Sequence, residues 1–283
     1  RIFTKTVKLN PTADQATAIE HINFELKADR NVPVKFLVNG VTGSGKTEVY
    51  LQSIEACIAS GRQAIILVPE IALTPQAIER YAGRFPGKIA VLHSGLTLGE
   101  RFDQWWAVRR GDYNIVLGSR SAIFAPLKDV GLVVVDEEHE WTYKQHDKSP
   151  RYHARAVAEK LCEITGGVLI AGSATPDVET FRRVEQGEYV ELRMPTRAGI
   201  ARGRFANRTA AGQANVHIID MKNELRAGHS ELFSRQLKDS IGEALNFGGR
   251  VILYMNRRGA GSFAQCGVCG YVSRCRRCDT TLV

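Results

Sequence analysis

The amino-acid sequence predicts an α/β fold in which a parallel β-sheet is covered by helices on both faces. Short unbroken runs of β-branched and other apolar residues recur along the chain, at residues 34–38, 64–68, 89–92, 115–118, 132–135 and 168–171. Helical spans separate these runs, and strands that are buried on both faces have continuous apolar sequences of this kind. Distinctive polar or glycine-rich segments follow the runs directly. Functional loops of such sheets lie at the carboxyl ends of the strands, so we expect one functional edge.

Composition narrows the class of protein. The chain has 283 residues, 44% of them hydrophobic and 24% charged, which is typical of a globular protein of about two domains. No apolar run approaches the ~18 residues of a membrane span and no signal peptide opens the chain, so we expect no membrane partner and a reducing, cytoplasmic location. The chain begins at Arg1, and we expect it to be a piece of a longer protein. The net charge of +8 favours a polyanionic partner such as nucleic acid, although general surface basicity explains the charge equally well.

A helix is predicted near the start of the chain. Asn10 can cap it and Pro11 suits its first turn. Gln15 lies at a suitable distance before the next motif to hydrogen-bond an adenine edge. The alternative is that Gln15 is a solvated helix residue.

A glycine-rich segment joins the run at 34–38 to a helix predicted from residue 48. It consists of Gly40, Val41, Thr42, Gly43, Ser44, Gly45, Lys46 and Thr47. This order fits G-x-x-x-x-G-K-[ST], the loop whose backbone N–H groups and helix N-terminus bind phosphate. We expect Lys46 to reach the β- and γ-phosphates of a nucleoside triphosphate and the Thr47 hydroxyl to bind Mg²⁺.

An acidic cluster directly follows the run at 132–135. Asp136 can hold Mg²⁺ through water, and Glu137 can orient or deprotonate the attacking water. His139 can connect the nucleotide to the rest of the protein. After the next run, Ser173 and Thr175 supply hydroxyl groups that can bond to the acidic cluster. The combination predicts a hydrolytic site.

Residues 140–155 alternate aromatic rings with cations, which suits single-stranded DNA because bases stack on rings while phosphates pair with charge. The alternative is a solvated loop with its aromatic residues tucked beneath it. The residues expected to contact DNA, or to couple that contact to hydrolysis, are Thr74, Ser119, Arg120, Trp141, Tyr143, Lys144, Arg151, Tyr152, Ser173 and Thr175. Thr74 is also expected to cap a helix that Pro75 begins.

The domain organisation changes after residue 196. We expect a nucleotide-binding lobe at 1–196, a linker or loop at 197–215, the start of a second lobe at 216–258, and a partial zinc-binding insertion at 259–283. Strands are predicted at 216–220 and 251–254, with a helix around 232–245 between them. Two C-x-x-C pairs, Cys266 with Cys269 and Cys275 with Cys278, offer four thiolates, and the simplest local arrangement is one tetrahedral Zn²⁺ site.

The segments GVTGSGKT, PEIALTPQ, GSRSAIF, DEEH and GSATP occur in this order, and the chain thereby resembles the superfamily 2 helicases. The stretch around 143–155 and the residues 256–259 make it more similar to the PriA family of primosomal replication-restart helicases. The resemblance implies a RecA-like P-loop lobe plus the start of a second lobe with a cysteine-rich zinc insertion. It also implies two zinc sites built from eight cysteines, so that each pair here would join a later pair.

The same resemblance implies an ATP-dependent 3′-to-5′ DNA helicase that recognises stalled or collapsed forks and initiates primosome assembly, with ATP, Mg²⁺ and Zn²⁺ as cofactors. Its partners would be forked and single-stranded DNA, primosome proteins and single-stranded-DNA-binding protein. The family's N-terminal DNA-binding region and its arginine finger do not occur in this sequence, so we expect the chain alone to hydrolyse ATP slowly and not to unwind DNA. Two alternatives stay open: a superfamily 2 duplex translocase, and a zinc-containing assembly scaffold that ATP switches.

Overall fold

The structure is a computed structural model that describes residues 6–28, 32–147, 149–198 and 215–254, together with 269, 271 and 272. It divides into two compact units, residues 1–211 and 212–283, which are described separately.

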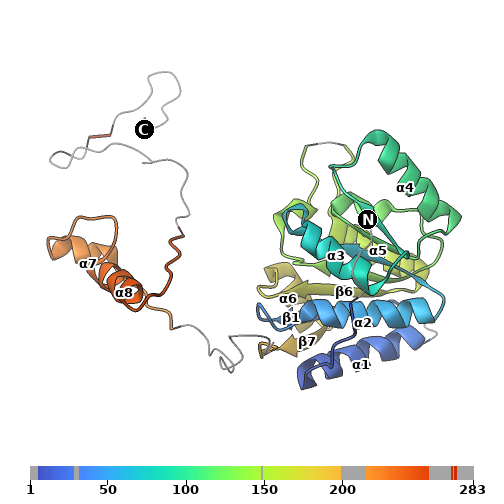
Figure 1. Cartoon of the computed structure of the whole chain (residues 1–283), viewed down its shortest axis with the longest axis horizontal. Coiled ribbons are helices and arrows are strands. Elements are labelled where there is room, and N and C mark those ends of the chain that lie inside the picture. The colour runs from blue at the N-terminus through green and yellow to red at the C-terminus, as the bar shows by residue number, and fades with distance from the viewer. Residues whose placement is uncertain are drawn as a thin grey trace. The chain divides into compact units, whose positions relative to one another are not determined.

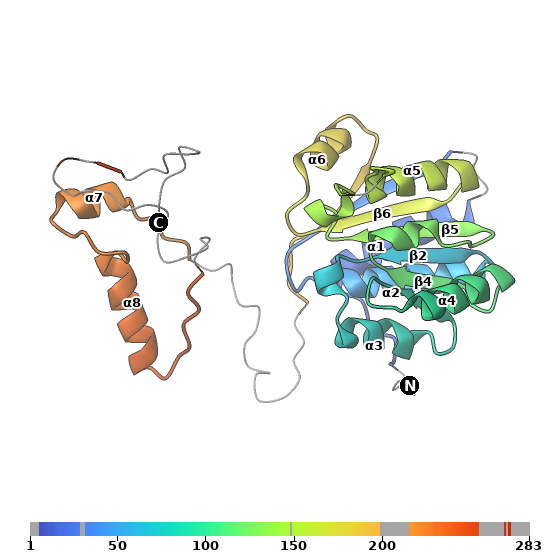
Figure 2. The ribbon, with the colours of Figure 1, turned by 90° about the horizontal axis from the view of Figure 1, so that it is seen from above.

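The first unit is built on a seven-stranded sheet whose strands run in the order β3-β4-β2-β5-β6-β1-β7. Its strands are β1 (Lys35–Gly40), β2 (Gln63–Leu67), β3 (Ile89–Leu92), β4 (Ile115–Gly118), β5 (Val130–Asp136), β6 (Val168–Ser173) and β7 (Val190–Met194). All neighbouring strands pair in parallel, and Figure 2 shows β6, β5, β2 and β4 following one another across the sheet. The six apolar runs are therefore strands, as predicted. The sequence analysis missed β7, whose burial is mixed and whose apolar character is weaker.

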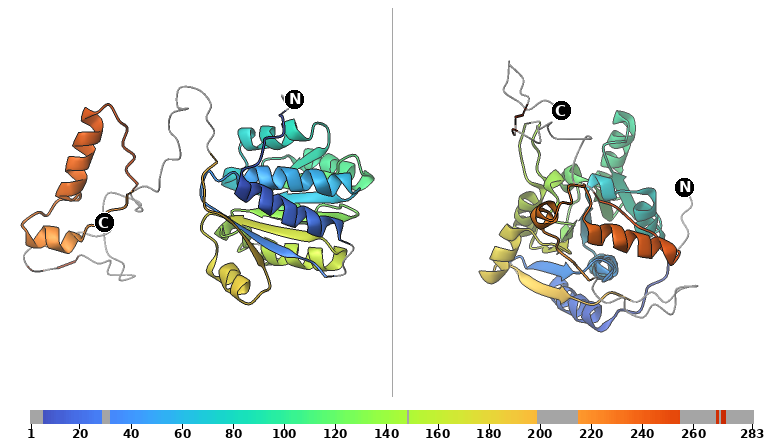
Figure 3. Two further views of the ribbon diagram at one scale, coloured as in Figure 1. Left: turned by 90° about the horizontal axis from the view of Figure 1, so that it is seen from below. Right: turned by 90° about the vertical axis from the view of Figure 1, so that its left-hand side faces the viewer.

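Helices cover both faces of this sheet, as predicted. One face packs against α1 (Ala13–Lys27), α2 (Lys46–Ala59) and α3 (Pro75–Arg84); α1 and α2 lie side by side across it (Figure 3). The other face packs against α5 (Ala154–Thr165), α6 (Val178–Glu185) and the end of α4 (Leu98–Arg110). In the chain's described ranges, none of the helices has the length and apolar character that crossing a membrane requires.

The two layers of core follow from the alternation of side chains along the strands. Ile66, Val134 and Ile170 point to the α1–α3 face, whereas Ile65, Val133 and Leu169 point to the α4–α6 face. All six are completely buried. Because both faces of every central strand are covered, the strands need apolar residues at every position, which explains their unbroken hydrophobic sequences.

The first helix begins at a different residue from the one predicted. Thr12, not Asn10, is the N-cap of α1, and it forms a capping box with Gln15. A threonine followed three residues later by glutamine can bond reciprocally to the first turn, and this gives Thr12 the advantage over Asn10.

The second unit contains two helices, α7 (Met221–Arg226) and α8 (Arg235–Asn246), within its described residues. The helix predicted around 232–245 is confirmed as α8, and Ser234 caps it. The strands predicted at 216–220 and 251–254 are wrong, because neither segment pairs with another strand among the described residues. Ile218 and Ile252 are almost fully exposed. An apolar run becomes a strand only when a neighbour accepts its backbone hydrogen bonds.

Candidate functional site

The sequence motifs meet at one edge of the sheet. The glycine-rich segment follows β1, the acidic cluster follows β5, and the Ser173 turn follows β6, which lies between β5 and β1. Two short 3₁₀ helices, η1 (Glu70–Ala72) and η2 (Arg120–Phe124), follow β2 and β4 at the same edge. A third, η3 (Trp141–Tyr143), follows the acidic cluster. Parallel pairing therefore brings all predicted motifs to the carboxyl ends of the strands.

The glycine-rich segment forms a tight loop that ends in the first turn of α2. Gly45 has φ +82°, a conformation that L side chains rarely adopt, and a Cβ at this position would overlap the amide of Gln15. Lys46 is buried, and its ammonium group donates to the Gly40 carbonyl at 2.9 Å. The loop therefore curls around its own lysine.

The end of β7 and the residues that follow it close the other side of this loop. The Val41 N–H donates to the Met194 carbonyl at 3.2 Å, and the Ala198 N–H donates to the Gly43 carbonyl at 2.9 Å. The loop is thus held on one side by α1 and on the other by the segment that leaves the sheet.

These residues fit a triphosphate and its Mg²⁺. The Ser44 hydroxyl is buried without a hydrogen-bond partner among the described residues. The first N–H groups of α2 have no partner within the helix, and they add the positive end of its dipole. A buried ammonium, an unsatisfied hydroxyl and a helix N-terminus make a donor set that phosphate oxygens would satisfy.

Gln15 supports the loop from outside. Its Nε2 donates to the Ser44 carbonyl at 2.8 Å, and its Oε1 accepts from the Thr12 N–H at 2.9 Å. The side chain is buried, so the alternative of a solvated helix residue is wrong. Recognition of adenine by Gln15 stays a prediction.

Asp136 ends β5 in a buried corner. Its Oδ1 accepts from the Tyr50 hydroxyl at 3.0 Å and from the Glu137 N–H at 3.1 Å. Burial, with the neighbouring Glu137 charge, raises the Asp136 pKa to about 6, although the Tyr50 hydrogen bond and the Lys46 charge oppose the shift. A carboxylate that is costly to ionise in this corner is well placed to accept a cation.

Glu137 and His139 form the exposed side of the acidic cluster. Glu137 has φ +47° and is alone among the described non-glycine residues in having a positive φ. A residue held in this conformation is strained by ~1–3 kcal/mol, and such strain clusters at functional sites. His139 Nδ1 lies 2.7 Å from the Ser173 hydroxyl and 3.7 Å from a Glu137 carboxylate oxygen. The predicted contact between the Ser173 turn and the acidic cluster is therefore present.

Comparison with known proteins decides the family. Residues 12–184 match the DEAD/DEAH box helicase family. The chain belongs to this family. The fold predicted for its first unit, a RecA-like P-loop lobe, agrees with the parallel sheet and with this match.

The chain is 43% identical over 282 residues to the replication restart protein PriA of Bacillus subtilis, an alignment that covers 100% of this chain and 33% of that protein. It is 43% identical over 252 residues to the replication restart protein PriA of Synechocystis sp., covering 87% of this chain and 29% of that protein. These matches confirm the resemblance to PriA. The chain spans about a third of the length of these relatives. The solved structure of RecG bound to a three-way DNA junction is 22% identical, with a TM-score of 0.49, and the match covers 66% of this chain and 24% of that chain.

The sequence analysis assigned no role to Glu138, which links the helicase motifs to one another. Its carboxylate is buried; one oxygen accepts from the Asp177 N–H at 2.7 Å and the other from the Thr180 hydroxyl at 2.8 Å. Arg155, at the start of α5, donates to the same oxygen at 2.5 Å. The sequence signal that could have indicated this pair is weak. It consists of a third acidic residue after an apolar strand and an arginine farther along the chain.

The aromatic-basic segment, residues 140–155, is attached to this edge at several points. The Arg120 guanidinium donates to the Thr142 and Lys144 carbonyls at 3.0 and 2.7 Å. Lys144 and His153 form an isolated antiparallel bridge that closes the base of the loop. The Tyr152 ring packs edge-on against Phe124 at 4.9 Å between ring centroids.

The structure separates the predicted DNA-contact residues by exposure. Trp141 is 72% exposed, and Lys144 and Arg151 are also exposed. The expectation that the Tyr143 ring contacts DNA needs correction, because this side chain is only 1% exposed. Its hydroxyl donates to the Asp136 carbonyl at 2.6 Å, so the ring lies beneath the acidic cluster and does not face a base. The apolar ring is more stable in the core because its one polar atom finds an acceptor there.

A groove at this edge lies between the aromatic-basic segment and the residues that follow β2 and β4. Its lining includes Arg101, Ser119, Arg120, Trp141 and Lys144.

Thr74 caps α3 as predicted, and its hydroxyl accepts from the Ala77 N–H at 3.2 Å. The Thr175 N–H donates to Ser173 Oγ at 2.9 Å, which holds the Ser173 turn in shape.

Three of the four predicted zinc ligands, Cys266, Cys275 and Cys278, lie outside the described residues. Cys269 is described, and it is exposed. Among the described residues there is no group of three or more side chains that would suit a metal ion.

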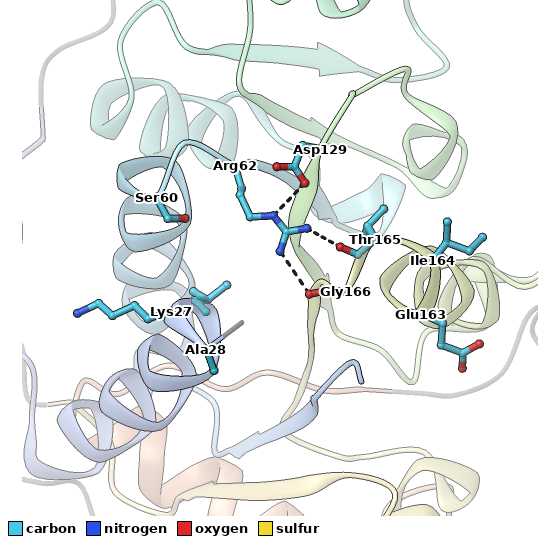
Figure 4. A pocket seen from close by; sticks show the side chains of 10 residues that line it. Lys27, Ala28, Ser60, Arg62, Asp129, Glu163, Ile164, Thr165 and Gly166 are labelled. Atoms are coloured by element: carbon cyan, nitrogen blue, oxygen red, sulfur yellow. Dashed lines mark hydrogen bonds and ion pairs between the residues drawn. The ribbon is translucent and has the colours of Figure 1, made fainter. Parts of the chain in front are cut away.

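A second pocket lies at the opposite end of the strands (Figure 4). Arg62 points into it, and its guanidinium donates to the carbonyls of Val130, Thr165 and Gly166 and to the Asp129 carboxylate. Because Arg62 bonds to the start of β5 and to the end of α5, we interpret it as a residue that stabilises this end of the sheet.

Proposed function

We propose that the chain carries the ATP-binding lobe of an ATP-dependent 3′-to-5′ DNA helicase that acts at stalled or collapsed replication forks and initiates primosome assembly. The observation that carries the proposal is the attachment of the aromatic-basic segment to the acidic cluster. Tyr143 bonds to Asp136, and Arg155, two residues beyond the loop, bonds to Glu138. A strand of DNA held by the loop would therefore act on the residues beside the triphosphate.

The proposed roles follow the geometry. The phosphate loop from Gly40 to Thr47 holds the triphosphate of ATP, with Lys46 turned from the Gly40 carbonyl toward its phosphates. Asp136 and Thr47 would hold Mg²⁺, which neutralises charge on the phosphate oxygens. Glu137 orients the attacking water and accepts its proton. His139, through Ser173, carries the position of the acidic cluster to the next loop.

DNA contact is assigned to residues of the groove and the loop, which range from the exposed Trp141 to the buried Ser119. Trp141 and Tyr152 would stack on bases, while Lys144, Arg151 and Arg120 pair with phosphates. Thr74, Ser119 and Thr175 are proposed as backbone contacts. Tyr143 is proposed as a coupling residue.

The wider proposal extends to the rest of the chain. We assign the ATP-binding lobe to residues 1–196, a connecting segment to 197–215, the start of the second lobe to 216–258 and a zinc-binding region to 259–283, with Cys266, Cys269, Cys275 and Cys278 as ligands. The protein would work in the cytoplasm with primosome proteins and single-stranded-DNA-binding protein. The resemblance to PriA supports these assignments.

The test is ATP hydrolysis by the 283-residue chain, measured with and without single-stranded DNA. We expect slow hydrolysis that Lys46→Ala abolishes, and no strand displacement on forked DNA. Lys160→Ala, an exposed lysine on α5 far from the loop, is the matched control and should leave the rate unchanged. Hydrolysis that is equally fast in Lys46→Ala would refute the proposal. Movement of the chain along duplex DNA, driven by hydrolysis and without strand separation, would identify a translocase instead.

A further inference from the structure

Helix α4 presents an exposed aromatic surface that the proposed function does not use. Phe102, Trp105 and Trp106 are 63%, 37% and 40% exposed, and Val108 is the buried residue of this helix. The Trp105 and Trp106 rings meet edge-on with centroids 5.4 Å apart, and Phe102 packs against Trp106 at 6.0 Å. Three clustered aromatic side chains on one helix face are uncommon on a surface without a binding role.

The cluster carries cations along one side. Arg101, Trp105 and Arg109 are spaced four residues apart, so they form a stripe about 12 Å long on the helix. The Arg109 guanidinium lies 5.8 Å from the centre of the Trp105 ring. Among the described residues, neither arginine has a carboxylate partner. The Glu100 carboxylate accepts from the Thr97 N–H as part of the helix cap, and it does not pair with either arginine.

The stripe begins in the groove of the candidate site. Arg101 lines that groove together with Ser119, Arg120 and Trp141. α4 lies at the β3 edge of the lobe, and α1 lies at the opposite, β7 edge (Figure 1). The α4 stripe therefore continues the groove outward, away from the phosphate loop.

We propose that the α4 stripe (Arg101, Phe102, Trp105, Trp106 and Arg109) is a second contact surface for single-stranded DNA, which continues the path that starts at Trp141. The alternation of arginine with aromatic rings matches the alternation of phosphate and base, and the Arg109–Trp105 pair adds a cation to the ring face. The inference rests on the proposed function, because the path starts at the proposed DNA groove.

The chain's three tryptophans are Trp105, Trp106 and Trp141, which makes the test specific. Trp141→Phe leaves fluorescence from α4 alone, whereas the double variant Trp105→Phe with Trp106→Phe leaves fluorescence from the loop alone. Each 283-residue variant is titrated with oligothymidylate at low and high salt, and fluorescence quenching is recorded. We expect quenching in both variants.

Affinity measured by anisotropy of labelled oligothymidylate provides the second readout. Trp105→Ala with Trp106→Ala should weaken binding about tenfold or more, since stacking on an aromatic side chain contributes about this much per base. Arg101→Gln with Arg109→Gln should weaken binding and flatten its salt dependence. Lys160→Gln, an exposed lysine on α5, is the control and should change neither.

The outcomes separate the two proposals. Quenching of Trp141 without quenching on α4, and unchanged affinity in the α4 variants, would overturn the inference and leave the proposed function intact. Absence of DNA binding in all variants and in the unsubstituted chain would overturn both. If the α4 variants change the sedimentation of the protein and not its DNA affinity, α4 is an interface between copies and the inference is wrong.

Discussion

The guanidinium of Arg155 lies 2.5 Å from the carboxylate of Glu138, and both side chains are buried. Arg155 also donates to the Thr180 hydroxyl at 2.6 Å and to Asp177 and Glu179 at 3.2 Å. Three segments that are far apart in sequence, the acidic cluster, the start of α5 and the start of α6, therefore share one cation. The Arg155 side chain thus connects these three segments at the carboxyl edge of the sheet.

Removing Arg155 should be strongly destabilising. Arg155→Ala leaves the Glu138 charge buried without its partner, so we expect the free energy of unfolding to fall by about 3–5 kcal/mol. Urea unfolding followed by circular dichroism measures this change. Arg182→Ala, which breaks an exposed pair with Glu185, is the control and should cost less than about 1 kcal/mol. Equal losses in the two variants would contradict this account.

Gly172→Ala should disturb Asp136, which it faces across the β5–β6 strand pair, by displacing Tyr50. A Cβ at Gly172 would overlap the Tyr50 hydroxyl, which is the donor that holds the Asp136 carboxylate. We expect weaker Mg²⁺-dependent nucleotide binding, measured by titration with a fluorescent ATP analogue. The same substitution at Gly99, which has open space around it, is the control. Tyr50→Phe keeps the ring and removes the hydroxyl, so it should reproduce part of the Gly172→Ala effect.

Gln15→Ala distinguishes base recognition from loop support. If Gln15 only holds the phosphate loop through the Ser44 carbonyl, ATP and GTP binding should weaken by the same factor. If it also bonds to adenine, ATP binding should weaken more than GTP binding. Competition between the two nucleotides measures the ratio directly. A variant that binds both as well as the unsubstituted chain would exclude either role.

Glu159 should make stability depend on pH. Burial alone would raise its pKa, but hydrogen bonds from Arg183 and Tyr189, together with the charges of Arg183 and Lys35, leave the Glu159 pKa below its usual value. A lowered pKa in the folded state means that the stabilisation is complete above the unfolded-state pKa of about 4.3 and is lost as pH falls toward the folded-state value.

Glu159→Gln should therefore flatten the decrease in unfolding free energy below about pH 4.3. Urea unfolding at pH 3 to 7 measures the slope. Glu185→Gln, at an exposed carboxylate, should leave the slope unchanged. A slope that Glu159→Gln does not alter would show that other carboxylates dominate the acid transition.

The sequence predicted the sheet well because every central strand is buried on both faces, which leaves an unmistakable apolar run. It also predicted that Gly40–Thr47, Asp136 and Ser173 meet, since parallel strands bring their carboxyl ends to one edge. It could not predict that Tyr143 lies beneath Asp136, because an aromatic residue beside cations has the same sequence whether it faces solvent or core. The sequence could not predict the Glu138–Arg155 ion pair either, because contact between residues distant in sequence depends on how α5 packs.

Two backbone hydrogen bonds couple the phosphate loop to the end of β7 and the residues after it. They join Val41 to Met194 and Ala198 to Gly43. Ala198 is the last residue of the described range 149–198, and it is bonded directly to the phosphate loop. Neither the phosphate loop nor residues 194–198 can change backbone conformation without breaking a hydrogen bond to the other. A change in the conformation of the phosphate loop would therefore be felt at once by β7, the strand that the sequence analysis missed, and by the residues that follow it up to Ala198.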